Sequence, residues 1–142
     1  MPAHIPEGFH SLTPYLVVDG VARLLDFLRD AFGAEEIGRY AAPDGRIMHA
    51  VVRIGDSMLE MGEPAPEWSP MPCGLHLYVE DADAVYARAL EAGGVSLAEP
   101  SVKPYGDREA GVRDPSGNFW YIATRQEQVE TGEGAQGSGL RR

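Results

Sequence analysis

The stretch Thr13–Gly33, TPYLVVDGVARLLDFLRDAFG, has a counterpart of equal length later in the chain, Gly74–Gly94, GLHLYVEDADAVYARALEAGG. Each stretch opens with an apolar run rich in β-branched and aromatic residues, which is typical of a strand. Each then continues with apolar residues at helical spacing and ends in glycine, which favours a helix stop. The two stretches therefore predict one unit, a strand followed by a helix, that is used twice.

Each unit also contains a residue that can cap its helix and is followed by a turn. Asp19 and Asp81 precede the two helical patterns, where an aspartate can cap the first turn. The turn Pro43-Asp44-Gly45 matches Pro104-Tyr105-Gly106 at the same offset that relates Thr13 to Gly74, here called the module offset. This repeat of turns predicts that each unit continues with three further strands.

A hairpin signal fixes the face of each strand in the first unit. Gly55-Asp56 separates Met48–Ile54 from Ser57–Met61 and is typical of a two-residue turn. Such a turn places Val51 opposite Glu60 and Arg53 opposite Met58. The other face of the hairpin is then uniformly apolar and consists of Ala50, Val52, Ile54, Leu59 and Met61. We predict an α+β fold, in which tandem βαβββ modules form a curved, cup-like mixed sheet with helices on its outer face.

The domain boundaries follow from composition. Glu63–Pro72, EPAPEWSPMP, has four prolines in ten residues and predicts a connector. We expect a single domain over 10–125, with modules at about 10–62 and 74–124 and a connector at 63–73. Residues 1–9 are an N-terminal extension, and the polar, glycine-rich stretch 126–142 is predicted to be a disordered tail.

Charge and composition exclude several classes of protein. The chain of 142 residues has a formal net charge of −10, which argues against nucleic acid as a partner. It contains no apolar run of about 20 residues that could span a membrane and no secretion signal. Its single cysteine, Cys73, has no partner for a disulfide or a CxxC zinc site. We expect a cytoplasmic protein; its acidity would favour a cationic ligand, although acidic surfaces also serve solubility alone.

Polar side chains gather on the predicted hollow face of the sheet. Alternation along the strands puts the apolar residues toward the helices and leaves a second set facing the hollow. The polar members of that set are Thr13, Tyr15, His49, Glu60, His76, Tyr78 and Tyr121.

Four segments resemble the vicinal oxygen chelate superfamily of glyoxalase I, bleomycin-resistance proteins and extradiol dioxygenases. They are DFLRDAFGAEE, MHAVVRIGDSMLEMGE, LHLYVEDADAVYARALEAGG and GVRDPSGNFWYIATR. The resemblance covers about 10–125, and within the superfamily the segments are most similar to the PhnB-like group. It implies the paired-module fold, and it also implies a homodimer.

The resemblance also implies where a metal ion would bind. The metal enzymes of the family carry one ligand on the first and one on the last strand of each module. Those positions are Thr13, Glu60, Gly74 and Tyr121 in this sequence. Only Glu60 is an ordinary ligand, so no cofactor is predicted; if a divalent metal binds, Glu60, His76 and His49 are the alternative ligands.

Each remaining candidate has a functional and a structural interpretation. Glu60 is the candidate catalytic base or anchor for a cationic group, and the alternative is a structural pair with Arg53 or Arg108. Arg108 itself could contact an anionic group or form a salt bridge. Trp68 could be a lid over the hollow or a dimer contact. His49 and His76 could act as acid–base groups, and Tyr15, Tyr78 and Tyr121 could stack on a planar ligand; the alternative for these five is a structural role.

Three functional hypotheses follow. The leading one is a small-molecule-binding protein of the bleomycin-resistance kind, without the usual metal quartet, that binds a planar or cationic organic ligand. The second is a metal-dependent lyase, isomerase or dioxygenase with an atypical ligand set. The third is a regulatory module whose hollow no longer binds anything.

Overall fold

The computed structural model describes residues 3–126. The first module contains β1 (Tyr15–Val17), α1 (Val21–Phe32), β2 (Glu35–Ala41), β3 (Ile47–Ile54) and β4 (Ser57–Gly62). The second module contains β5 (Gly74–Tyr78), α2 (Ala82–Glu91), β6 (Val95–Val102), β7 (Asp107–Arg113) and β8 (Phe119–Arg125). The α+β class and the βαβββ modules are thus confirmed, while the predicted disordered tail lies, except for Gln126, outside the described residues.

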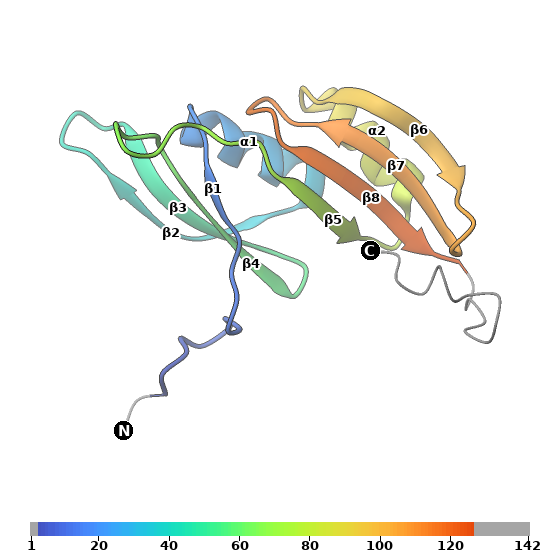
Figure 1. The fold of residues 1–142 in the computed structure, drawn as a ribbon, viewed down its shortest axis with the longest axis horizontal. Helices are drawn as coiled ribbons and strands as arrows, with labels where there is room; N and C mark the ends of the chain where they lie inside the picture. Colours follow the sequence, from blue (N-terminus) through green and yellow to red (C-terminus); the bar gives the residue numbers. More distant parts are fainter. Residues whose placement is uncertain (1–2, 127–142) are drawn as a thin grey trace.

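The two modules have the same topology but form separate sheets (Figure 1). The strand orders are β1-β4-β3-β2 and β5-β8-β7-β6, with a parallel first pair and antiparallel pairs elsewhere. Tyr15 pairs with Glu60 in the first sheet, and His76 pairs with Tyr121 in the second, which preserves the module offset. The prediction of one mixed sheet is therefore corrected to two four-stranded sheets. The free edge of β1 meets the connector, through a bridge between Val17 and Met71, and does not pair with β5.

The module offset becomes one position shorter in the third strand of the modules. His49 pairs with Gly62 in the first module, whereas Glu109 pairs with Ala123 in the second. In the first module, a register shift near Ala41 accommodates one extra residue, which shortens the offset by one. In the second module, the turn before β8 is one residue longer, which restores the offset. The structural counterpart of His49 is consequently Glu109.

The start of α1 differs from the sequence prediction. Gly20, and not Asp19, is the N-cap residue; its φ of 102° lies in the left-handed region that favours glycine. The side chain of Glu63 accepts hydrogen bonds from the backbone N–H groups of Gly20 at 3.2 Å and Val21 at 2.7 Å. Because β4 runs parallel to β1, its end lies beside the start of α1, and a residue 42 positions away supplies the cap. Asp81 caps α2 as predicted, through Ala84 N–H at 3.1 Å.

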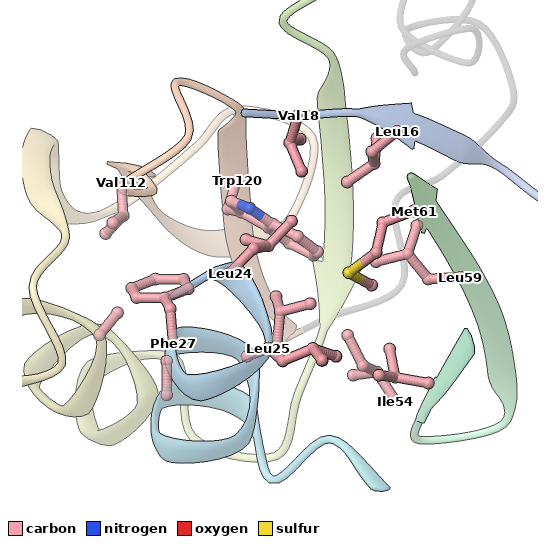
Figure 2. Packing of buried hydrophobic residues seen from close by; sticks show 14 of the residues in the cluster. Leu16, Val18, Leu24, Leu25, Phe27, Ile54, Leu59, Met61, Val112 and Trp120 are labelled. Atoms are coloured by element: carbon pink, nitrogen blue, oxygen red, sulfur yellow. The ribbon is translucent and has the colours of Figure 1, made fainter. Parts of the chain in front are cut away.

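Helix α1 packs against both modules and joins them (Figure 1). Phe27 and Leu24 of α1 lie in one buried cluster with Val112 and Trp120 of the second module (Figure 2). The ring of Phe32 lies 4.7 Å from that of Trp120, and α1 also contacts α2. The apolar faces of both sheets therefore point toward the helices, which leaves the opposite face of each sheet, here called the open face, for other uses. Within residues 3–126, no helix is both long and apolar enough to cross a bilayer.

Candidate functional site

The open face of the first sheet carries Tyr15, His49 and Glu60. His49 Nε2 lies 3.2 Å from Glu60 Oε1, and these two side chains are 33% and 29% exposed. The ring of Tyr15 lies 5.7 Å from the imidazole of His49 and covers Gly62, where any added Cβ would collide with the tyrosine hydroxyl. The absence of a side chain at Gly62 thus seats Tyr15 beside the His49–Glu60 pair, as the predicted alternation of the hairpin requires.

Glu60 is one of the residues that line an open hollow of about 540 Å³. The N-terminal extension supplies most of the other walls, and Thr13 completes them. Its lining residues are His4, Ile5, Pro6, Phe9, His10, Ser11, Thr13 and Glu60. Glu60 is the single acid among them, and no lysine or arginine is present. The role of the extension was not predicted, because its sequence has no strand or helix pattern to place it.

A narrower cavity of about 230 Å³ lies between the modules. Leu12 and Pro14 line one side, and Leu75, Leu77 and Trp120 line another. Most of its wall is apolar, and His76 is one of its few polar side chains. The cavity is thus a mainly apolar space at the boundary of the two modules, and it reaches the open face of the second sheet at His76.

The open face of the second sheet holds a compact polar cluster. His76 Nε2 lies 3.3 Å from Glu109 Oε1 and 4.0 Å from Asp107 Oδ2. Both carboxylates are buried, with Asp107 wholly inaccessible and Glu109 6% exposed. These acids were not singled out from the sequence, because the module offset aligns His49 with Ala110, and the one-position shift of the repeat hides Glu109 as its counterpart. Two acids at alternate positions, however, lie on one face of a strand, and this signal was available in the sequence.

Neighbouring side chains hold the two carboxylates in place. Tyr105 donates a hydrogen bond to Glu109 at 2.8 Å. Tyr78 and Arg125 each donate to Asp107 at 2.8 Å. The hydrogen bond to Tyr78 raises the pKa of the Arg125 guanidinium above its usual value, and the charge of Asp107 adds to this effect. Arg125 therefore stays protonated and balances one of the two buried carboxylates.

Other predicted residues lie away from these clusters. Arg108 points to the helix side of β7 and pairs with Asp83 of α2 at 2.6 Å, which is the structural alternative for this residue. This hydrogen bond lowers the pKa of the Asp83 carboxyl and raises that of Arg108. Trp68 is 61% exposed in a short turn of the connector, and neither cavity described above includes it. Tyr121 lies on the open face of β8 and is 37% exposed.

The residues present do not fit the metal quartet that the family uses. Gly74 has no side chain, and the nearest group to an added Cβ there would be the ring of Tyr121 at 3.7 Å. The alternative trio of Glu60, His49 and His76 is also not assembled within the chain. His49 and Glu60 lie on the first sheet, whereas His76 faces Asp107 and Glu109 on the second.

Comparison with known proteins gives a consistent result. Residues 8–122 match the model of the Glyoxalase/Bleomycin resistance protein/Dioxygenase superfamily. An uncharacterized protein of Mycobacterium bovis is 32% identical over 91% of this chain and 95% of its own length. The structure of TioX from Micromonospora sp. ML1 has a TM-score of 0.71 at 23% identity, over 82% of this chain and 98% of that chain. The structure of a glyoxalase-related enzyme from Fulvimarina pelagi has a TM-score of 0.68 at 17% identity, and the match covers 81% of this chain and 87% of that chain.

Proposed function

Because the chain belongs to the Glyoxalase/Bleomycin resistance protein/Dioxygenase superfamily, we propose that it binds a small, planar organic cation without the metal quartet of that family. The observation that carries this proposal is the hollow beside Glu60. Its volume of about 540 Å³ is within the range of ligand-binding pockets, and its one formally charged lining residue is an acid. A partly buried carboxylate among neutral walls attracts a cation more strongly than an exposed one, because less solvent screens it.

Aromatic side chains support a planar ligand. Tyr15 is 48% exposed beside the His49–Glu60 pair, and Phe9 lines the hollow. The face of an aromatic ring attracts a cation and stacks on a flat π system. In this proposal Glu60 anchors the cationic group, His49 orients the carboxylate, and Phe9 stacks on the ligand. The ligand is bound and not chemically changed.

A titration with ethidium, a planar organic cation, tests this function. We expect the chain, in buffer containing EDTA, to bind ethidium and the Glu60→Gln variant to bind it about tenfold more weakly, which corresponds to about 1.4 kcal/mol. Fluorescence and calorimetric titrations measure both affinities. The control variant Asp26→Asn removes an exposed acid of α1 and should leave binding unchanged.

The planar anion 8-anilinonaphthalene-1-sulfonate serves as the matched probe. We expect that Glu60→Gln does not weaken its binding, since removing a negative charge removes no attraction for an anion. Equal affinity of wild type and Glu60→Gln for ethidium would contradict the role of Glu60, and no binding of ethidium by the wild type would contradict the ligand class.

We also propose that two copies of the chain form a homodimer in which the open faces are covered. Tyr78 is 50%, Phe119 38% and Tyr121 37% exposed on the second open face of the single chain. Contiguous aromatic surface of this kind is typical of an interaction site. Covering the first module of one copy with the second module of the other would enclose the ligand from both sides.

A pair of lysine variants tests the dimer. We expect sedimentation of the wild type at twice the mass of one chain, and dissociation of Tyr121→Lys, because a buried, unpaired ammonium opposes association. Asp26→Lys places the same residue on the exposed surface of α1 and should remain dimeric. A monomeric wild type at high concentration would contradict the proposal.

Two further assignments are proposals of lower detail. The first is membership of the PhnB-like group, to which the four segments that resemble the superfamily are together most similar. A metal-dependent lyase, isomerase or dioxygenase is the second candidate function, and the cluster of His76, Asp107 and Glu109 is the observation that favours it.

A further inference from the structure

The polar cluster of the second sheet has the composition and spacing of a metal site. Within residues 3–126, His76, Asp107 and Glu109 form the one group of three histidine, cysteine or acidic side chains whose ligand atoms all lie within 4.8 Å of one another. Around an ion bound at about 2.0–2.2 Å, neighbouring donor atoms lie roughly 3–3.5 Å apart. The distance of 3.3 Å between His76 and Glu109 already fits, and that of 4.0 Å to Asp107 needs a small side-chain movement.

The backbone brings these side chains together across a small residue. His76 comes from β5 and the two acids from β7, with β8 between them. Ala123 of β8 is fully buried and pairs with Glu109 on one side and with Tyr78 on the other. Its methyl group is small enough for side chains from both outer strands to meet above it. The first module has Gly62 at this position, but Tyr15 fills the space there.

Hydrogen bonds outside the cluster orient the ligand groups. Tyr105 holds Glu109, while Tyr78 and Arg125 hold Asp107. Such outer partners are typical of metal sites, where they fix the direction of each carboxylate. A carboxylate oxygen has two lone pairs, so an oxygen that accepts a hydrogen bond can still bind a cation.

The charges also favour a cation. Two buried carboxylates carry two negative charges, and Arg125 supplies one positive charge. Buried charges are normally paired or bound to a metal, because an unbalanced ion in the interior is strongly disfavoured. A divalent metal ion bound between the two carboxylates would supply the positive charge that Arg125 alone does not.

We propose that His76 Nε2 and one oxygen each of Asp107 and Glu109 bind a divalent transition-metal ion. One imidazole with two carboxylates suits Zn²⁺, Co²⁺ or Mn²⁺. Three protein ligands leave at least one coordination position open to water or to an oxygen of a bound molecule. This site uses the first and third strands of one module and shares no residue with the quartet Thr13, Glu60, Gly74 and Tyr121. It does not depend on the proposed organic cation, whose anchor lies on the first module.

A Co²⁺ titration of the EDTA-treated and dialysed full-length chain tests the site. We expect one ion per chain by elemental analysis and by calorimetry, and the visible absorption of bound Co²⁺. In the proton NMR spectrum, the imidazole N–H of His76 should appear far outside the normal range, because the paramagnetic ion lies on the same ring. Zn²⁺ should compete with Co²⁺ and abolish both signals.

Variants assign the ligands. Glu109→Gln and His76→Gln should each weaken Co²⁺ binding about 100-fold. Tyr105→Phe removes the hydroxyl that donates to Glu109 and keeps the ring, and it should weaken binding about tenfold. Asp83→Asn removes an exposed acid on the helix side of the module and should not change the affinity. Thermal unfolding of each variant checks that it folds. If Glu109→Gln does not fold, Tyr105→Phe still tests the site.

Two outcomes would overturn the proposal. If the wild type binds no Co²⁺ or Zn²⁺ at millimolar concentration, the cluster is not a metal site. If Glu60→Gln abolishes Co²⁺ binding while Glu109→Gln and His76→Gln retain it, the ion occupies the first module instead. Neither outcome alters the expected binding of ethidium in EDTA, so failure of this site and failure of the proposed function are distinguishable.

Discussion

Replacing Asp114 with alanine is expected to lower the free energy of unfolding by about 3–5 kcal/mol. The Asp114 carboxylate is 3% exposed and accepts hydrogen bonds from Trp120 Nε1 at 2.9 Å, Asn118 Nδ2 at 3.0 Å and the backbone N–H groups of Asn118 and Ser116. Asn118 in turn accepts from the backbone N–H of Cys73 at 3.0 Å. The DPSGN turn therefore ties β8 to the start of β5, and loss of Asp114 leaves several buried donors unpaired.

Urea unfolding at neutral pH measures this effect, with Asp44→Ala as the matched control. Asp44 occupies a turn of the first module and accepts from the backbone N–H of Arg46 at 2.9 Å, but it does so in solvent. Because water can replace an exposed carboxylate as a hydrogen-bond acceptor, we expect Asp44→Ala to lower the free energy of unfolding by less than about 1 kcal/mol. Equal effects of the two substitutions would show that the buried network does not stabilise the turn.

The second large effect is expected for Gly94→Ala, at about 2–3 kcal/mol of destabilisation. A Cβ at Gly94 would lie 2.5 Å from Val112 Cγ1, 2.9 Å from the carbonyl oxygen of Ala89 and 3.3 Å from the Phe27 ring. The ring belongs to α1 and the other two groups to the second module, so the added methyl forces apart elements of the shared core. The backbone carbonyl of α2 cannot move away without disturbing the helix.

Gly38→Ala is the control, and chemical denaturation compares the two variants. Both glycines have backbone conformations that alanine can adopt, but an added Cβ at Gly38 meets nothing within 4 Å. We expect Gly38→Ala to change the free energy of unfolding by less than about 0.5 kcal/mol. If Gly94→Ala lowered the free energy of unfolding as little as Gly38→Ala, α1 and the second module would be packed less closely than described.

Local sequence signals predicted the fold well. Gly55-Asp56 permits a two-residue turn, and the pairs Arg53–Met58 and Val51–Glu60 followed from it and are confirmed. The constant module offset predicted matched strands and helices because each module must bury one apolar face. Alternation along the strands predicted that Tyr15 and Glu60 share a face, and the structure makes them neighbours through the pairing of β1 with β4.

The polar clusters on the two open faces could not be predicted in full, because their assembly depends on information that the sequence pattern lacks. A shared face does not tell which sheet a side chain belongs to, so the predicted trio put His76 with Glu60 although the chain forms two sheets. The acids of β7 were missed because the repeat shifts by one position there, which makes Glu109 and not Ala110 the counterpart of His49. The cap of α1 by Glu63 joins residues 42 and 43 positions apart, and only the completed sheet brings them together.

The central claim is that the first module anchors a planar cation through Glu60. A crystal structure of the chain grown with ethidium tests it most directly. We expect the ring system to lie against Phe9, in the hollow bounded by the N-terminal extension, with its charged ring above the Glu60 carboxylate. Ethidium bound only elsewhere, with the hollow filled by side chains, would contradict the claim.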